Sequence, residues 1–227
     1  MFTRISALAF NSAKSRNPIV RTLSVDLFQT VIQKTSDDTH LQLAAIELLS
    51  LPKAGKTAGS DHRVALYSML SFLPPSSAVS TFMIQSIPPL LAKETHDGAM
   101  ATLATALPAH IVFLLRANQP LSSEAVNLVA KEMNNPKLLV RRAFCSVTGN
   151  AIWEYGDLES EASLAFVKAT LPSLESNLKN VSVNPPIATS GSIEGYIPLA
   201  ILLGRLSRSH EFGRYSMCLS ASLDRST

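Results

Sequence analysis

One short pattern recurs along this chain about every 40 residues, and the recurrence constrains the fold more than any other feature. The pattern is an arginine near the start of an apolar segment, and it occurs at Arg21, Arg63 and Arg141. The intervals are 42 residues and 78 residues, and 78 is twice 39. A further copy is therefore expected near residue 100, where HDGAMATLATAL keeps small residues but has no arginine. A unit that recurs at this period predicts a repeat architecture.

Each copy begins a segment with the periodicity of an α-helix. Residues two, six and ten positions after the arginines lie on one helical face: Leu23, Leu27 and Val31; Ala65, Met69 and Leu73; Ala143, Val147 and Ala151. The copy near residue 100 has the corresponding row Ala101, Thr105 and Ala109. Two of the segments are preceded by Asn-Pro, and proline is well tolerated in a first helical turn.

A repeat of about 40 residues with two helices per unit is typical of HEAT and armadillo repeats. We expect outer helices at 2–13, 39–51, 77–91, 121–134 and 159–180, and inner helices at 17–34, 60–73, 97–116, 136–155 and 192–207. Pro108 is expected to kink the third inner helix. The sequence therefore predicts an all-α, HEAT/armadillo-like solenoid of about five antiparallel helix pairs over residues 1–209, followed by an atypical tail at 210–227. Neither end resembles a polar capping helix, which predicts a piece of a longer solenoid.

Composition supports a packed helical domain. Hydrophobic residues make up 46% of the 227 residues and charged residues 16%, which argues against disorder. The net charge of +3 is mild, and the cations are spread along the chain, so nucleic-acid binding is possible but not required. The two cysteines form no disulfide framework, which indicates a reducing compartment and predicts a cytoplasmic location. No apolar run is long enough to predict a membrane span.

The N-terminal segment has a second interpretation. Arg4, Lys14, Arg16 and Arg21 all precede the first acidic residue, Asp26, and the segment is rich in serine. That pattern is typical of a mitochondrial transit peptide. A first amphipathic helix explains the same residues, because the apolar spacing continues into the next segment. Both interpretations stay open at this point.

Residues that could perform chemistry do not combine into a recognisable site. Gly55-Lys56-Thr57 resembles part of a phosphate-binding loop, but Ser50 stands where that loop needs a glycine. Cys145 lies beside Phe144 and Val147, which favours a buried thiol over a nucleophile. No two of the five histidines have the spacing of metal ligands. We expect a non-enzymatic protein with no catalytic residue, cofactor, metal or small-molecule substrate.

The repeated arginines and their neighbours suggest two different roles. Arg21, Arg63 and Arg141 are expected to form a structural ladder with acidic residues of adjacent repeats. In the last segment the apolar face comprises Val140, Phe144, Val147 and Ala151, and Arg141 flanks it. Arg142 is one residue further on, about 100° around the helix, and is expected to point outward. With Lys137 it could contact phosphates or an acidic partner.

Three segments resemble a known family. KEMNNPKLLVRRAFCSVTGNAIWEYGD, LPSLESNLKNVSVNP and SIEGYIPLAILLG are similar to the N-terminal repeat arm of the general-control translational activator family, most clearly over residues 131–204. Members are very large ribosome-associated HEAT-repeat proteins that help to activate the kinase of translation initiation factor two alpha during amino-acid starvation. The resemblance implies a helical scaffold with the ribosome and other proteins of the activator complex as partners. It does not imply the kinase-binding surface, which lies in another part of such proteins.

Two other classes of protein fit the same repeats. One is an unrelated HEAT-repeat adaptor of the tubulin-binding or transport type. The other is a small imported mitochondrial helical protein, which depends on the transit-peptide interpretation of the N-terminus.

Overall fold

Ten helices are found in the residues that this computed structural model describes, which are 2–54, 59–155 and 160–183. In chain order they are α1 (Phe2–Ser12), α2 (Pro18–Ile32), α3 (Asp38–Ala54), α4 (Ser60–Leu70), α5 (Ser77–Leu91), α6 (Asp97–Thr105), α7 (Pro108–Arg116), α8 (Ser123–Glu132), α9 (Leu138–Tyr155) and α10 (Glu161–Val183). The described part of the chain contains no strand.

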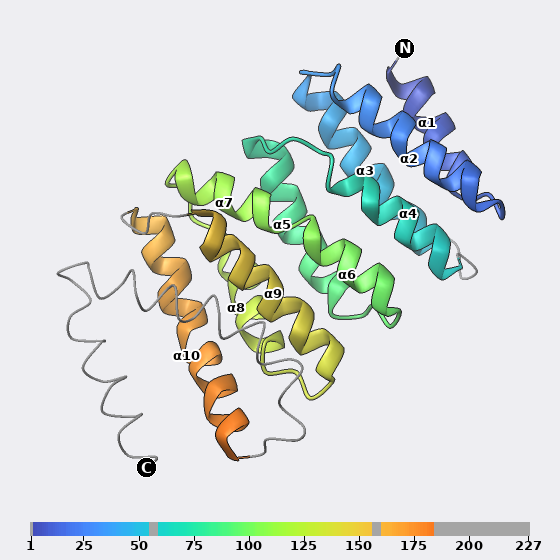
Figure 1. The fold of residues 1–227 in the computed structure, drawn as a ribbon. Helices are drawn as coiled ribbons and strands as arrows, with labels where there is room; N and C mark the ends of the chain where they lie inside the picture. Colours follow the sequence, from blue (N-terminus) through green and yellow to red (C-terminus); the bar gives the residue numbers. More distant parts are fainter. Residues whose placement is uncertain (1, 55–58, 156–159, 184–227) are drawn as a thin grey trace.

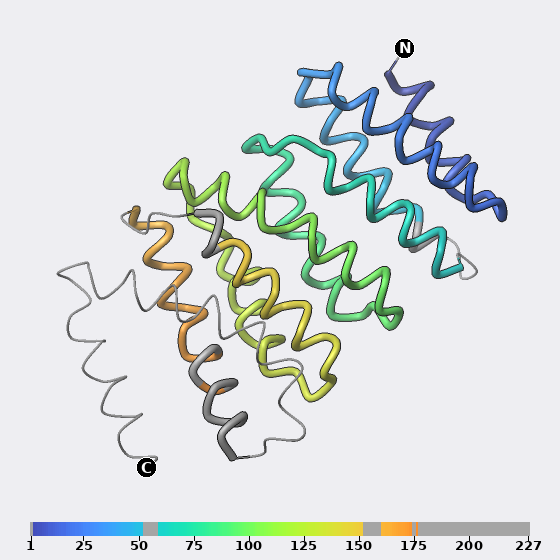
Figure 2. Tube along the Cα trace, in the orientation of Figure 1, coloured from blue at the N-terminus to red at the C-terminus, as the bar shows by residue number. Residues whose placement is uncertain are grey.

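The helices stack as two parallel layers (Figures 1 and 2). One layer consists of α1, α3, α5, α8 and α10, and the other of α2, α4, the α6–α7 segment and α9. From α1 to α8 each outer helix packs against the next outer helix and against its antiparallel partner in the other layer, and α10 packs against α8. This arrangement confirms the predicted α-solenoid, with the first layer as the predicted outer helices and the second as the inner helices. The predicted inner helix at 192–207 and the predicted tail at 210–227 lie outside the described residues.

Side-chain caps begin several of the helices. The side chain of Asn17 accepts a hydrogen bond from the backbone N–H of Ile19, and the hydroxyls of Ser76 and Ser122 accept from the third residue after each. Such caps satisfy N–H groups that have no partner within the helix. The linkers therefore end one helix and begin the next within a few residues, as a stack of short helix pairs requires.

The third inner helix is divided where the sequence predicted a continuous but kinked segment at 97–116. Helix α6 ends at Thr105 and α7 begins at Pro108, with a turn between them. Proline has no N–H to donate to the carbonyl four residues earlier, and its ring clashes with that carbonyl, although Leu107 before it keeps a helical conformation. The local effect of Pro108 is therefore a break in the helix.

The segment Asp97–Arg116 is also long and apolar enough, by length and composition, to cross a membrane. In this fold it forms two helices instead of one, and 67% of its most apolar window is buried within the protein. Packing between neighbouring repeats accounts for that composition, as it does for the core helix of any helical array.

The apolar rows are buried in two of the four inner segments. Ala65, Met69 and Leu73 are buried, as are all the predicted face residues of α9: Val140, Phe144, Val147 and Ala151. In α2 the row is displaced, because Leu23 is 60% exposed while Ser24, Phe28 and Ile32 form the buried face. Among the described helices of its layer, α2 has a neighbour, α4, on one side only, so the side that carries Leu23 is not covered.

The row at Ala101, Thr105 and Ala109 is exposed as well. The buried residues of α6 are Ala99, Met100, Leu103 and Ala104, so the face that enters the core is offset from the face that the repeat arithmetic indicated. This repeat has no arginine to mark the start of the pattern, so the sequence alone did not show which face of the helix is buried.

Candidate functional site

Arg21 connects the first repeat to the second. It lies in the first turns of α2, and its Nη2 is 2.9 Å from Oδ2 of Asp61 in the first turn of α4. Its Nη1 donates to the backbone carbonyls of Ser15 and Arg16 in the α1–α2 turn, each at 3.0 Å. Asp61 is 66% exposed, so the ion pair itself is screened by water and adds little stability.

Arg63 makes a more enclosed version of this connection. Its Nε donates to Oε2 of Glu94 and its Nη2 donates to Oε1, both at 3.0 Å, so the guanidinium forms a bidentate pair with the carboxylate. The Glu94 side chain is only 5% exposed, and its Oε1 also accepts from the backbone N–H groups of Thr95 and His96 at 2.9 and 3.0 Å. Arg63 thereby fastens α4 to the α5–α6 linker of the next repeat.

Opposing effects act on the ionisable groups of this cluster. Burial acts to raise the pKa of Glu94, but hydrogen bonds from Arg63 and from the backbone of His96 and Thr95 outweigh it, so this pKa is lowered from its ordinary value. Burial, together with the negative charge of Glu94, raises the pKa of Tyr67 to about 12. At neutral pH the cluster therefore consists of a charged carboxylate, a charged guanidinium and a neutral phenol.

Arg141 occupies the same place in α9 as Arg21 does in α2. Its Nη1 donates to the backbone carbonyl of Asn135 at 3.0 Å, and Arg21 likewise reaches a carbonyl six residues before it. Within the described residues no carboxylate pairs with Arg141. The ladder of three arginines thus stays a prediction: two of its members contact a carboxylate of the following repeat, and the third contacts the turn that precedes it.

Lys137 and Arg142, the predicted partner-contact residues, are both exposed but lie in different surroundings. Lys137 is in the α8–α9 turn, where its backbone N–H donates to Oδ1 of Asn135 at 2.8 Å. Arg142 lines an open groove of about 390 Å³ between α6 and α9, together with Asp97 and Leu139. Lys137 is not among the residues that line the groove. Small side chains, Ala101 and Ala104 among them, leave the space that forms it.

The carboxylate partners of Arg21 and Arg63 have no signal in the sequence. Glu94 follows Arg63 by 31 residues and Asp61 follows Arg21 by 40, so no constant offset marks the two carboxylates. A buried pair was also missed: Ser80 Oγ on α5 lies 3.0 Å from Nδ1 of His110 on α7. Burial lowers the pKa of His110 to about 4, so its imidazole is neutral at physiological pH.

Groups that could act in catalysis or metal binding are dispersed over the described part of the chain. No group of three or more His, Cys, Asp or Glu side chains is placed there to hold a metal ion. The Ser80–His110 pair is fully enclosed in the core. Gly55-Lys56-Thr57 lies outside the described residues.

Cys145 is buried, as the sequence predicted, with only 2% of its surface exposed. In the folded protein it is expected to react with a bulky disulfide reagent far more slowly than in denaturant, because the reagent cannot reach the thiolate. The measurement is absorbance-monitored labelling of a Cys218→Ser variant, so that only Cys145 reports. Native labelling as fast as labelling in denaturant would contradict the buried position.

The fold and the contacts between its repeats define a class: an α-solenoid of HEAT type, in which arginines of one helix pair bind the next pair. The comparison with protein families is more specific. A model described as "Generalcontrol nonderepressible 1 (Gcn1) N-terminal" matches residues 60–224. The chain therefore belongs to the Gcn1 N-terminal family, and the match extends beyond the segments whose resemblance was noted in the sequence. Searches of curated proteins and of solved structures found no match.

Proposed function

We propose that this protein is a ribosome-associated scaffold that supports activation of the initiation factor two alpha kinase when amino acids are scarce. Membership of the Gcn1 N-terminal family carries the proposal, because it links this solenoid to translation regulation. The described helices support a scaffold role in physical terms, since a stack of repeats offers a long surface of exposed side chains. We further propose that it acts in the cytoplasm, with the ribosome and proteins of the activator complex as partners.

Lys137 and Arg142 are the residues that we propose for the contact with the ribosome. Both are exposed cations near the N-terminal end of α9, and ribosomes present dense negative charge. Arg141, one residue away, is half-buried and donates to the backbone of Asn135, so it serves the fold instead. In this proposal Arg141 stabilises the fold, and Arg142, which follows it in the sequence, contacts the ribosome.

The proposal predicts that Lys137→Ala combined with Arg142→Ala weakens co-sedimentation with purified ribosomes. The loss should be largest at low salt, because exposed charge contacts are screened as the salt concentration rises. The melting temperature should change little, since exposed ion pairs contribute little to stability. Arg4→Ala combined with Lys34→Ala removes two exposed cations of the first repeat and is the matched control, which should bind as the wild type does.

Two results would contradict parts of this proposal. If the wild-type chain does not sediment with ribosomes, a HEAT-repeat adaptor with a different partner becomes the better interpretation. If the wild-type chain binds and the double variant binds equally well, the ribosome contact does not involve Lys137 and Arg142.

A further inference from the structure

The turns between helices lie along two opposite edges of the solenoid (Figure 1). One edge is formed by the turns that lead from an outer helix to an inner helix: α1–α2, α3–α4, α5–α6 and α8–α9. Exposed cations occur at three of these four turns, and we call them the basic edge: Lys14, Arg16, Lys93, Lys131 and Lys137. Residues 55–58 of the α3–α4 turn are not described.

Most of the carboxylates on the same edge are already engaged within the protein. Asp61 pairs with Arg21, and Glu94 is held by both nitrogens of the Arg63 fork. Glu132 is buried and accepts a hydrogen bond from the side chain of Asn135. Asp97, in the first turn of α6, is the exposed acid that remains on this edge in the described residues. Contacts within the protein therefore engage Asp61, Glu94 and Glu132, while the five cations of the basic edge face solvent.

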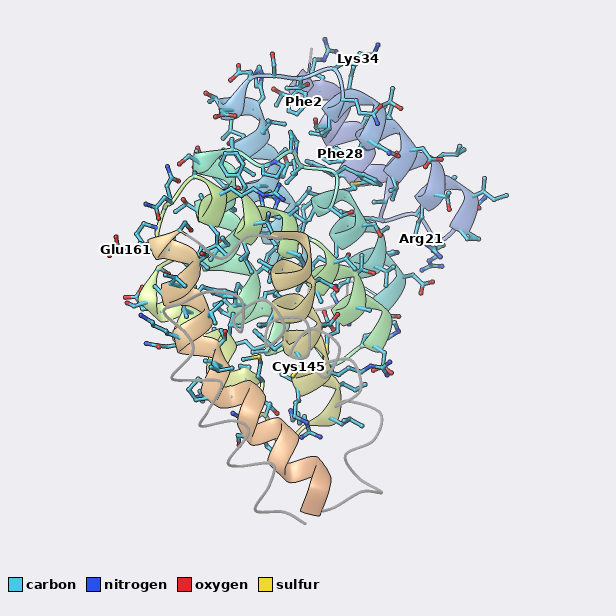
Figure 3. The ribbon with its side chains drawn as sticks, turned by 60° about the vertical axis from the view of Figure 1, so that its left-hand side comes forward. Phe2, Arg21, Phe28, Lys34, Cys145 and Glu161 are labelled. Atoms are coloured by element: carbon cyan, nitrogen blue, oxygen red, sulfur yellow. The ribbon has the colours of Figure 1, made fainter. Side chains whose placement is uncertain are left out.

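The opposite edge has a different balance of charge. Its turns carry the exposed acids Asp37, Asp38, Glu124 and Glu161 beside the exposed cations Arg4, Lys34 and Arg116. Figure 3 shows Arg21 and Lys34 at opposite ends of α2, and so at the two different edges. The small net charge of the whole chain conceals this asymmetry, because it sums over both edges.

We propose that the basic edge binds the phosphate backbone of RNA. Helices in contact pack about 8–10 Å apart, so the neighbouring α5–α6 and α8–α9 turns place Lys93, Lys131 and Lys137 at intervals that an extended phosphodiester strand can follow. The cations of the α1–α2 turn lie further along the same edge. The five side chains are lysines and an arginine without an aromatic neighbour for base stacking at these positions, which favours backbone contact without sequence preference. The proposed function is used only to name ribosomal RNA as the source of these phosphates.

The test compares a variant of the basic edge with a matched variant of the opposite edge. The first is Arg16→Ala/Lys93→Ala/Lys137→Ala, and the second, which removes the same number of charges, is Arg4→Ala/Lys34→Ala/Arg116→Ala. Fluorescence anisotropy with labelled poly(U) and poly(A) gives the affinity over a range of salt concentrations. Removing three phosphate contacts should reduce the magnitude of the slope of log K against log salt by about 2, equally for both RNAs. The opposite-edge variant should keep the wild-type slope, and a charge-preserving Arg16→Lys/Lys93→Arg/Lys137→Arg variant should keep wild-type binding.

The other outcomes separate this inference from the proposed function. Equal losses in the two alanine variants would overturn the inference, because net charge alone would then explain binding. Loss of ribosome co-sedimentation in the edge variant, with no RNA binding by the wild type, would also overturn it and assign the edge to an acidic protein. RNA binding through the edge without ribosome binding would support the inference and overturn the proposed function. Failure of the wild type to bind either RNA or ribosomes would overturn both.

Discussion

Arg63→Ala is expected to lower the free energy of unfolding by about 3 kcal/mol, the low end of the range for breaking a buried ion pair. The substitution leaves the carboxylate of Glu94, which is 5% exposed, without the two charge-assisted hydrogen bonds that hold it. An unpaired charge away from water costs far more than the pair itself contributes. Urea denaturation followed by circular dichroism measures the change.

A second substitution provides the control. Asp61→Asn removes the partner of Arg21, but Asp61 is largely exposed, so the cost should stay below about 1 kcal/mol. Adding Glu94→Gln to Arg63→Ala should recover part of the loss, because no buried charge then remains. If Arg63→Ala and Asp61→Asn cost the same, or if the double variant is less stable than Arg63→Ala alone, burial of Glu94 does not determine the effect.

Acid is expected to destabilise the protein by about 3 kcal/mol between pH 6.5 and pH 4 through His110 alone. The pKa of this imidazole is lowered from its ordinary value of 6.5 to about 4 in the folded protein, because the side chain is buried against Ser80. As the pH falls below 6.5, the unfolded chain takes up a proton that the folded protein does not. The contribution of His110 to the free energy of unfolding is therefore fully present above about pH 6.5. It declines until the pH reaches the folded-state pKa of His110, about 4.

The control is His110→Gln, which keeps a polar side chain near Ser80 but cannot be protonated. This variant should be less stable at pH 7 and should show a shallower decline between pH 6.5 and pH 4. The carboxylate of Glu94 also has a lowered pKa, but its contribution is lost only as the pH falls below about 4.5, the ordinary range of a glutamate. An unchanged slope in His110→Gln over the upper part of the range would show that another group titrates there.

Periodicity predicted the buried face of one inner helix and misplaced that of another. Helix α9 packs against α6, α7 and α8, and its predicted apolar face is buried throughout. In α2 the same reasoning assigned Leu23 to the face, yet Leu23 is exposed. The helical period indicates which residues share a face, but only the neighbouring helices decide which face is covered.

The arginines illustrate the same limit at the level of single contacts. Their spacing along the chain predicted a structural role, and the structure places Arg21 and Arg63 against carboxylates of the next repeat. The acids themselves could not be predicted, because linker lengths vary and a long side chain reaches several positions. The different surroundings of Lys137 and Arg142 also depend on α6, which is distant from both in the sequence.

The amino-acid sequence by itself determined the repeat, the helical content and the two-layer order of helices, since each depends on local periodicity. Pro108 predicted a kink from its backbone chemistry, and the structure has a break there. Tertiary structure alone decided which carboxylates are buried and which are exposed. Stacking brings Glu94 against Arg63 and away from water, while Asp61 stays in solvent beside Arg21. The same stacking aligns the turns of successive repeats and gathers dispersed lysines along one edge. Burial and charge clustering arise from residues far apart in the chain, so they exist only once the repeats have packed.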